Sequence, residues 1–215
     1  MGHALVIGAS GGIGAALARH LARDHEVTAL SRGAQGLDVT DPASVARHLS
    51  DLAPVDIAFV ATGILAPDGH APEKSLDAID ADAMARTFAV NAIGPALVLK
   101  HLAPLLAPAG RVGILTARVG SIGDNRMGGW HSYRAAKAAA NQIVHGAAIE
   151  IGRRNKGSVV VALHPGTVET PFTEGYKAPK VTPERSAENL VGVLTGLDPA
   201  KSGGFFDYAG RPIEW

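Results

Sequence analysis

Residues 3–24, HALVIGASGGIGAALARHLARD, join a short apolar run, a cluster of glycines and a helical pattern without a gap. The run at 3–9 is continuous rather than alternating, which is typical of a strand covered on both faces. Residues 12–24 have the apolar spacing of a helix. The stretch therefore predicts a strand, a tight glycine turn and a helix, which is the first unit of a parallel α/β sheet.

The glycine turn, spaced G-x-x-x-G-x-G, has a chemical use as well as a geometric one. Residues without Cβ let a backbone approach a pyrophosphate, and a helix N-terminus offers free N–H groups and a positive dipole end. Glycine is also favoured in any strand-to-helix turn, but its position at the first such turn favours dinucleotide binding. The residues expected to line the turn are Gly8, Ser10, Gly12, Ile13 and Gly14.

The strand–helix alternation continues to the end of the chain. Buried-strand runs followed by helical patterns imply a doubly wound parallel sheet. Asp41 is expected to cap one helix, with Pro42 at its first position. The fold class is thus α/β, a single Rossmann-type domain over 1–215 with helices on both faces of the sheet. Strands are expected at 3–9, 26–30, 55–62, 110–117, 157–166 and 203–210, and helices at 12–24, 41–52, 80–106, 132–154 and 182–197.

Composition argues against several classes of function. The 20 Lys and Arg balance the 20 Asp and Glu, so no basic surface for nucleic acid or an anionic membrane is expected. The chain has no cysteine, and its nine histidines lack metal-binding spacing, so neither thiol chemistry nor a metal is expected. The first residues lack the basic start of a signal peptide, and no apolar run approaches the ~18 residues of a membrane span. The expectation is a cytoplasmic protein.

The end of the second strand bears on the choice of cofactor. NAD-binding proteins place an acidic residue about 20 positions beyond the glycine loop, where it holds the ribose 2′-OH. Here Ser31 and Arg32 occupy that place, and an arginine can pair with a 2′-phosphate. Arg32 could instead be an ordinary surface residue. Further along, Asp38 and Val39 could hold the adenine, although Asp38 could also simply end a strand. The sequence thus predicts NADP(H) as the preferred cofactor and NAD(H) as the alternative.

Two tyrosines stand four residues before a lysine. Tyr133 and Lys137 fall in an Ala-rich helical stretch, where residues i and i+4 share a face. Tyr176 and Lys180 are separated by Pro179, which forbids a regular helical turn, so this second match is interpreted as a coincidence in a loop. A free phenol has a pKa near 10 and is a poor acid–base catalyst at neutral pH. The Lys137 ammonium is therefore expected to lower the pKa of Tyr133 toward working pH.

Five motifs, taken in order, resemble the short-chain dehydrogenase/reductase family over essentially the whole chain. They are GASGGIG at 8–14, LDVTD at 37–41, NAIG at 91–94, the Tyr133–Lys137 pair and HPGTVET at 164–170. Each motif alone is common, but their ordered conjunction is specific. The stretches ARVGSIGDN, GGWHSYRAAKAAANQ and GGFFDYAGRPIEW are similar to the branch that includes C-factor-like proteins and sniffer-type carbonyl reductases.

The resemblance implies roles for individual residues. In the family the tyrosine donates a proton to the carbonyl oxygen, the lysine also binds the nicotinamide ribose, and a helix asparagine supports a water relay. His164 is interpreted as a structural residue at a strand end, because the mechanism already has a proton donor. The implied catalytic set is Tyr133, Lys137, Asn91 and Ser121, of which the first three also contact the cofactor, and the implied nicotinamide turn contains Pro165, Gly166, Val168 and Thr170.

Two departures from the family pattern affect these roles. The family serine lies thirteen residues before the tyrosine, where this chain has Gly120; aligning the strands instead puts Ala117 in that place. Ser121, in a longer loop, is expected to polarise the substrate carbonyl, with Thr116 as the alternative. The family's Asn-Asn-Ala-Gly is replaced by VATG, in which Gly63 can still let the backbone approach the cofactor. Another group must then satisfy the turn that the missing asparagine would bond.

The expected function is hydride transfer between NADP(H) and a small-molecule carbonyl or alcohol, with Tyr133 as proton donor. The alternative is a cofactor-binding signalling or regulatory protein with little turnover. The intact Tyr–Lys–Asn set favours the enzyme, and the displaced serine favours the alternative. The stretches 82–107 and 133–154 offer more apolar surface than one sheet face can cover. In the family these helices commonly pair between subunits, so a homodimer or homotetramer is expected.

Overall fold

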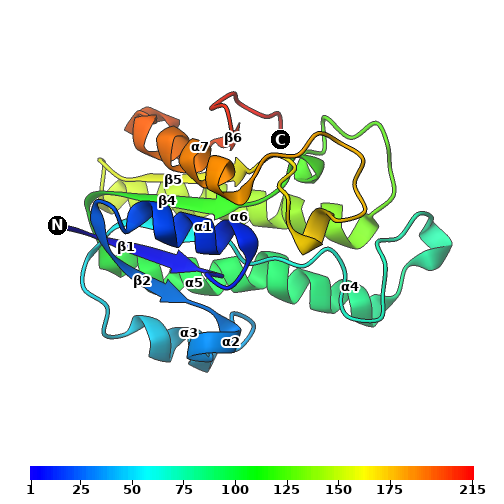
Figure 1. Cartoon of the computed structure of the whole chain (residues 1–215), viewed down its shortest axis with the longest axis horizontal. Helices are drawn as coiled ribbons and strands as arrows, with labels where there is room; N and C mark the ends of the chain where they lie inside the picture. Colours follow the sequence, from blue (N-terminus) through cyan, green and yellow to red (C-terminus); the bar gives the residue numbers. More distant parts are fainter.

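The computed structural model describes residues 1–215 and contains one sheet of six parallel strands in the order β2-β1-β3-β4-β5-β6 (Figure 1). Every neighbouring pair is parallel. The central strands are buried on both faces, as continuous apolar runs require. The strands are β1 (Gly2–Ile7), β2 (His25–Leu30), β3 (Val55–Val60), β4 (Leu106–Leu115), β5 (Val159–His164) and β6 (Phe205–Asp207).

Helices cover both faces of the sheet and form two separate hydrophobic clusters (Figure 1). On one face α1 packs against α7, and Leu17 and Leu190 are fully buried there. On the other face α3, α5 and α6 bury side chains such as Val45, Val98 and Val144. The helices are α1 (Gly12–Leu21), α2 (Arg32–Gln35), α3 (Pro42–Leu49), α4 (Ala81–Phe88), α5 (Gly94–Leu102), α6 (His131–Arg154) and α7 (Pro183–Gly196).

The predicted fold class is confirmed, with corrections at some boundaries. All six expected strands are present, and the Asp41 carboxylate caps α3 by accepting from the Ala43 N–H. The last strand is shorter than the expected 203–210. β4 begins at Leu106 rather than at the expected residue 110, so the residue expected to end a helix belongs to the strand. The reason is that Leu106 pairs with Val55 of β3, ahead of a register shift between the two strands. The short α2 was not predicted.

The long helical stretch expected at 80–106 contains a π-helical segment. α4 runs into a π-helix, η2 (Ala89–Ile93), and then into α5 and a 3₁₀ turn, η3 (Ala103–Leu105). Single π-turns inside α-helices are frequent at functional sites. The buried Asn91 lies in this segment. Gly94 follows it, and a Cβ there would approach the Val39 side chain to 2.9 Å, so the helix lies close to the 37–41 loop.

The helix over Ala81–Leu105 is long and apolar enough to cross a membrane, with a window of mean hydropathy 1.3 that is 39% buried. Length and composition alone indicate a membrane span only weakly, because the core helix of a globular domain meets the same criteria. Here Val98, Leu99 and Leu102 of α5 belong to the hydrophobic cluster beneath the sheet.

The strand order reverses at β1, and this places a candidate ligand site at the carboxyl edge of the sheet. From β1 the chain moves outward to β2 and then returns to β3 on the other side of β1. In open α/β sheets ligands bind where the strand order reverses in this way. The two backbones are in close contact at this point, since a Cβ on Gly8 would lie 2.8 Å from the carbonyl carbon of Ala61. The fold therefore places the candidate site at the ends of β1 and β3.

Candidate active site

The glycine turn after β1 fits a bound pyrophosphate. Gly8 has φ +88°, a conformation that favours glycine, and a Cβ on Gly14 would lie 2.2 Å from the Gly8 carbonyl oxygen. α1 has no side-chain cap and no acidic residue in its first turn. No backbone carbonyl accepts from the Gly12 and Ile13 N–H groups. Free donors at a helix N-terminus are the groups that bind anions, and Ser10 is exposed beside them. Binding of a pyrophosphate by these residues stays a prediction.

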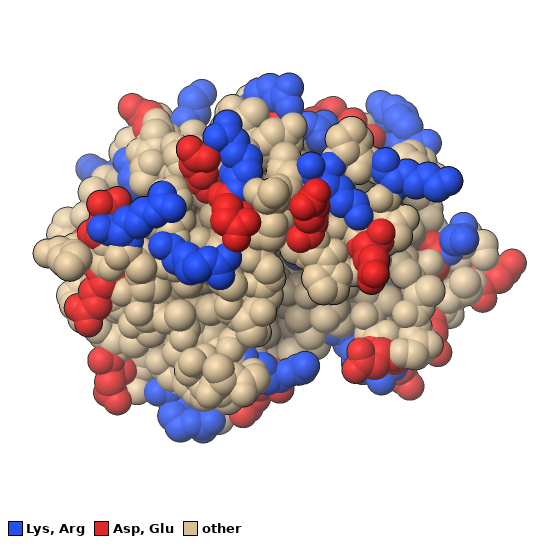
Figure 2. All heavy atoms as spheres, in the orientation of Figure 1, with Lys and Arg blue, Asp and Glu red and all other residues tan.

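Buried polar atoms without partners gather at the same edge of the sheet. The Thr62 and Thr116 hydroxyls and the His164 Nδ1 make no hydrogen bond within the chain. These residues follow or end β3, β4 and β5, three adjacent strands. Such atoms normally have partners, so a polar ligand fits this edge. Figure 2 shows a hollow on this face with mostly uncharged walls, and charges of both signs scattered around it.

The turn after β2 leaves Arg32 available to a ligand. Ser31 caps α2: its hydroxyl accepts from the Ala34 N–H and donates to Gln35. Arg32 is exposed, and no hydrogen bond or ion pair involves its guanidinium. The Asp38 carboxylate accepts from the Thr40 N–H and hydroxyl, and these bonds hold its pKa below its ordinary value. Val39 is buried beside this loop. The contacts of these residues with a cofactor stay predictions.

Tyr133 and Lys137 lie one turn apart on α6, and both are almost completely buried. The Lys137 Nζ lies 5.7 Å from the centre of the Tyr133 ring and donates to the Leu115 carbonyl at 3.1 Å. The pair therefore shares one helix face, as its spacing predicts. Tyr176 and Lys180 do not form a helical turn, also as predicted, since Lys180 donates instead to the carbonyls of Thr173 and Glu174.

Asn91 supplies the hydrogen bonds that the altered turn after β3 needs. Its Nδ2 donates to the Ile64 carbonyl at 2.8 Å, and its Oδ1 accepts from the Ile64 N–H at 3.1 Å. A Cβ on the preceding Gly63 would lie 3.0 Å from Asn91 Oδ1 and 3.3 Å from Lys137 Nζ. The structure thus brings Gly63, Asn91 and Lys137 together. The role of Asn91 in a water relay stays a prediction.

The loop after β4 explains why a glycine occupies the usual serine position. A Cβ on Gly120 would lie 2.9 Å from Lys137 backbone and side-chain atoms, so the turn η4 (Arg118–Gly120) contacts α6 directly. Ser121 follows and is buried, and its hydroxyl accepts from the Asp124 N–H at 3.1 Å. This leaves the Ser121 proton free for another acceptor. The Thr116 hydroxyl, at the end of β4, is also buried but has no partner.

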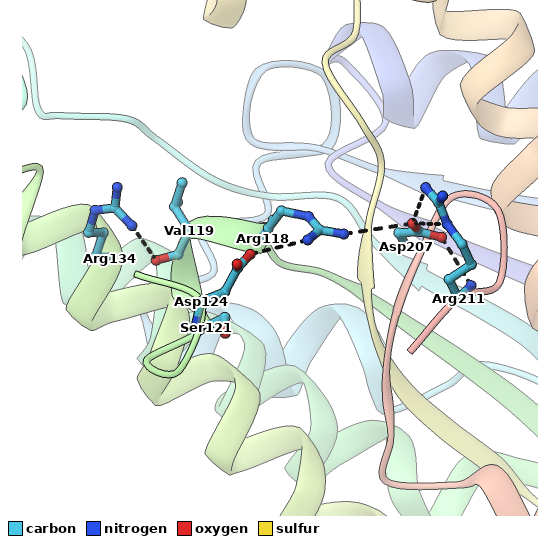
Figure 3. Close-up of polar contacts among 7 residues, drawn as sticks. All are labelled: Arg118, Val119, Ser121, Asp124, Arg134, Asp207 and Arg211. Carbon is cyan, nitrogen blue, oxygen red and sulfur yellow. Dashed lines mark hydrogen bonds and ion pairs between the residues drawn. The ribbon is translucent and has the colours of Figure 1, made fainter. Parts of the chain in front are cut away.

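An ionic network ties this loop to the end of β6 (Figure 3). Arg118 pairs with Asp124 at 3.1 Å and with the buried Asp207 at 3.8 Å. Arg211 pairs with Asp207 at 2.7 Å. Arg134 of α6 donates to the Val119 carbonyl at 3.3 Å. The loop that carries Ser121 is therefore held from two sides.

The turn after β5 faces the glycine turn. Gly166 has φ +81°, and the Val168 side chain is buried. A Cβ on Gly12 would lie 2.7 Å from the Thr170 methyl group, so the two turns touch. Pro165 accepts from the Ser186 hydroxyl of α7 through its carbonyl. The turn predicted to hold the nicotinamide thus lies against the turn predicted to hold the pyrophosphate.

Comparison with known proteins decides the family. A model of short-chain dehydrogenases, described as enoyl-(acyl carrier protein) reductase, matches residues 18–198. The chain belongs to the short-chain dehydrogenase/reductase family. A 1-hydroxy-2-glutathionyl-2-methyl-3-butene dehydrogenase of Rhodococcus sp. (strain AD45) is 34% identical over 234 residues, and the alignment covers 100% of both proteins.

Two further proteins extend the comparison. C-signal of Myxococcus xanthus is 39% identical over 143 residues, which cover 66% of this chain and 84% of that protein. A solved short-chain dehydrogenase/reductase from Burkholderia multivorans with bound NADP has a TM-score of 0.82 at 28% identity, covering 100% of this chain and 99% of that one. As a family member, this chain is an NAD(P)-dependent oxidoreductase that acts on CH–OH or C=O groups of small molecules.

The charge states of the family's Tyr–Lys pair differ from the expectation. Burial raises the pKa of Tyr133 well above its ordinary value, and the neighbouring Tyr176 adds to the rise. The expected lowering by Lys137 is therefore not found, because burial dominates and lowers the pKa of Lys137 itself to about 8. Burial also lowers the pKa of His164 to about 4, so this histidine is neutral at pH 7. Tyr133 stays protonated at neutral pH, as a proton donor must.

The buried Lys137 gives a prediction with two opposite trends. Its pKa of about 8 in the folded chain lies below the ordinary 10.5, so the unfolded chain binds more protons between these values. The free energy of unfolding should therefore rise from pH 8 toward pH 10.5, while carbonyl reduction falls as the ammonium is lost. Chemical denaturation and pH–rate profiles would measure both. Lys137→Met should abolish both trends, and Lys100→Met, at an exposed lysine, should keep them.

Sequence reasoning missed a group of residues around Tyr133. Trp130, Phe172 and Tyr176 are aromatic neighbours of the tyrosine or of one another. Glu73, from the loop between β3 and α4, accepts hydrogen bonds from the Ser132 N–H and hydroxyl. No spacing rule connects these residues. Tyr176, which the sequence placed in a coincidental match, lies in the site for a different reason, namely its ring contact with Trp130 at 5.7 Å.

Proposed function

We propose that this protein is an NADP(H)-dependent carbonyl reductase with Tyr133 as proton donor. The observation that carries the proposal is the convergence of Lys137, Asn91 and Gly63 beside Tyr133, at the sheet edge that also holds the glycine turn. A screen of aldehydes, ketones and quinones with NADPH tests it. Loss of NADPH absorbance with some members of the screen is expected, and no turnover of any of them would contradict the proposal.

The chain's own residues divide the work of such a reaction. The free N–H groups at the start of α1 would hold the pyrophosphate, and Lys137 would hold the nicotinamide ribose. The bound cofactor supplies the hydride that reaches the carbonyl carbon. Tyr133 gives its hydroxyl proton to the carbonyl oxygen, so that the alcohol forms, and Ser121 polarises that oxygen with its free proton. The neutral Tyr133 phenol suits this direction of reaction.

Arg32 supports a preference for NADP(H), which is also the ligand of the Burkholderia multivorans structure. A charge-assisted contact with the 2′-phosphate is worth roughly 1.5–3 kcal/mol, or about 10- to 150-fold in affinity. We expect NADPH to bind more tightly than NADH by this factor, and Arg32→Ala to remove the difference. Fluorescence titration of both cofactors measures it. Arg23→Ala, at an exposed arginine past α1, is the matched control, and equal affinity in the wild type would contradict the prediction.

We propose a homo-oligomer because η2 and α6, which pack against each other, both carry exposed apolar residues. Ile93 of η2 is 51% exposed and Ile149 of α6 is 49% exposed, and the two elements contact each other. Light scattering should give a dimer or tetramer rather than a 22.0 kDa species. Ile149→Asp should shift it toward the monomer, while Leu76→Asp, at an exposed leucine outside these helices, should not. A wild type that is monomeric at micromolar concentration would overturn the proposal.

A second candidate function is a cofactor-binding regulator with little turnover. For either candidate, we propose a cytoplasmic location. Two observations favour the regulator. The Tyr133 side chain is only 6% exposed and packs against aromatic rings, so little of its surface is open to a substrate. The relative C-signal has a name that implies signalling. Turnover in the screen, and its loss when the Tyr133 hydroxyl is removed, separate the two candidates.

A further inference from the structure

Three aromatic side chains, here called the aromatic enclosure, gather around Tyr133. The Trp130 ring meets the Tyr133 ring edge-on at 6.2 Å, and the Phe172 ring lies 5.9 Å from it. The Tyr176 ring is 5.7 Å from Trp130. All these distances fall within the ~4.5–7 Å range of favourable aromatic pairs. Trp130 precedes α6, whereas Phe172 and Tyr176 come from the segment after β5, so two distant parts of the chain form the enclosure.

The backbone at Trp130 is held in an unfavourable conformation. Gly128, Gly129 and Trp130 have φ values of +63°, +63° and +51°. For a residue with a Cβ, the left-handed region is unfavourable, because the Cβ lies too close to the following carbonyl oxygen. Strain of this kind persists where the surrounding structure fixes it, and it clusters at active sites and ligand clamps. The turn therefore places the indole beside Tyr133 at a cost in stability.

Glu73 fixes the strained turn from the other side. Its carbonyl accepts from the Trp130 N–H at 2.5 Å, and its carboxylate accepts from the Ser132 N–H and hydroxyl. Glu73 is 8% exposed. Burial works against its ionisation, but the hydrogen bonds from Ser132 outweigh burial and hold the pKa of Glu73 below its ordinary value. The position of Trp130 is thus set by the Glu73 backbone carbonyl, which binds its N–H, and by the buried, ionised Glu73 carboxylate, which holds Ser132 two residues later.

The enclosure presents ring faces and two neutral polar groups, the Trp130 indole N–H and the Tyr176 hydroxyl. The Tyr176 hydroxyl is buried without a hydrogen-bond partner, and a ligand oxygen would satisfy it. Phe172, 37% exposed, forms the outer rim. Two nearby cations are already engaged, since Arg134 donates to the carbonyls of Gly129 and Val119 and Lys180 to those of Thr173 and Glu174. The chemistry of the aromatic enclosure therefore matches a flat, uncharged ligand with one oxygen acceptor.

We propose that the aromatic enclosure selects flat, uncharged aryl carbonyl compounds as substrates. The inference rests on the proposed carbonyl reduction and names its substrate class. The aryl group lies against Trp130 and Phe172, which directs the carbonyl oxygen to Tyr133. Trp130 and Phe172 are then residues that determine specificity, and Tyr176 donates a second hydrogen bond to the substrate. Each lost ring contact should reduce the preference for aryl substrates by about 2- to 12-fold.

Turnover with matched ketones tests the selection. Acetophenone and 2-octanone have equal carbon numbers, and 4-acetylbenzoate adds a negative charge. With NADPH, kcat/KM should be highest for acetophenone, and Phe172→Leu and Trp130→Leu should each lower its ratio to 2-octanone by about 2- to 12-fold. Phe172 is at the surface, so its variant tests the idea even if Trp130→Leu does not fold. Trp215→Leu, at the chain's other tryptophan, which packs on Phe205, should leave the ratio unchanged. An unchanged ratio in the folded enclosure variants overturns the inference.

A binding measurement separates this inference from the proposed function. Trp215→Phe leaves Trp130 as the only tryptophan, so its fluorescence reports on the enclosure alone. Acetophenone added to this variant with NADP⁺ should quench Trp130 at lower concentration than 2-octanone, and Phe172→Leu should weaken the effect. Quenching without turnover of any ketone would sustain the enclosure and refute the reductase. Turnover with no difference between the two ketones in either assay would sustain the reductase and refute the selection by the enclosure.

Discussion

Tyr133→Phe is expected to lower carbonyl reduction by at least about 10²- to 10⁴-fold, the range that acid–base catalysis supplies. The change removes one hydroxyl and keeps the ring, so the contacts with Trp130 and Phe172 persist. NADPH affinity should barely change, because most of the groups expected to hold the cofactor lie elsewhere, in the glycine turn, at Arg32 and at Lys137. Steady-state turnover with an active carbonyl substrate and a separate titration of NADPH measure the two effects.

Two further variants serve as comparisons for Tyr133→Phe. Tyr208→Phe deletes a hydroxyl from another of the three tyrosines, one in the turn after β6, and should leave turnover unchanged. Lys137→Met should weaken both turnover and cofactor binding, since the lysine is proposed to act on both. If Tyr133→Phe keeps full turnover where the wild type is clearly active, the catalytic role is wrong. The regulator would then be the better account.

Ser121→Ala is expected to lower turnover by about 10²- to 10³-fold, the usual cost of losing one donor to a developing oxyanion. The Ser121 hydroxyl accepts from the Asp124 N–H, which orients it and leaves its proton free. Its loop is fixed against α6 at Gly120 and through Arg118. NADPH affinity should be unaffected, so the loss should appear mainly in kcat. Turnover and NADPH titration on the folded variant give this comparison.

Thr116→Val is the matched control for Ser121→Ala. Thr116 lies just past β4 with its hydroxyl buried and unpartnered, so it is the other residue that could polarise the carbonyl. Valine keeps its shape and removes only the hydroxyl. We expect Thr116→Val to retain most of the turnover. A reversed result, with Ser121→Ala fully active and Thr116→Val impaired, would move the role to Thr116.

The fold was predictable because all its strands and its longer helices carry a local signal. The strands are continuous apolar runs, and their helices have caps such as Asp41. The glycine turn was predictable for the same reason, since Gly8 and Gly14 occupy positions where a Cβ would collide with backbone atoms. The Tyr133–Lys137 pair needed only the helical period. In each case the relevant neighbours are close in the sequence.

The rest of the site depends on contacts between distant segments. Glu73 reaches Ser132 across 59 residues, and Asn91 reaches Ile64 across 27. Tyr176 joins the site through Trp130, not through its spacing from Lys180. The pKa of Tyr133 could not be predicted either, because it depends on burial, which spacing does not reveal. Such pairings come from the tertiary structure, so a single sequence contains no period or spacing that indicates them.

The π-helical segment η2 sets a limit on engineering this enzyme. A π-turn holds an extra residue, so α5 is rotated about its axis relative to a regular continuation of α4. Deleting one residue between Ala89 and Ile93 would give a more regular helix, which is a common aim of stabilising redesign. It would also turn Asn91 away from Ile64 and release the backbone beside Gly63. At this helix, gains in thermal tolerance and retention of activity are therefore opposing goals.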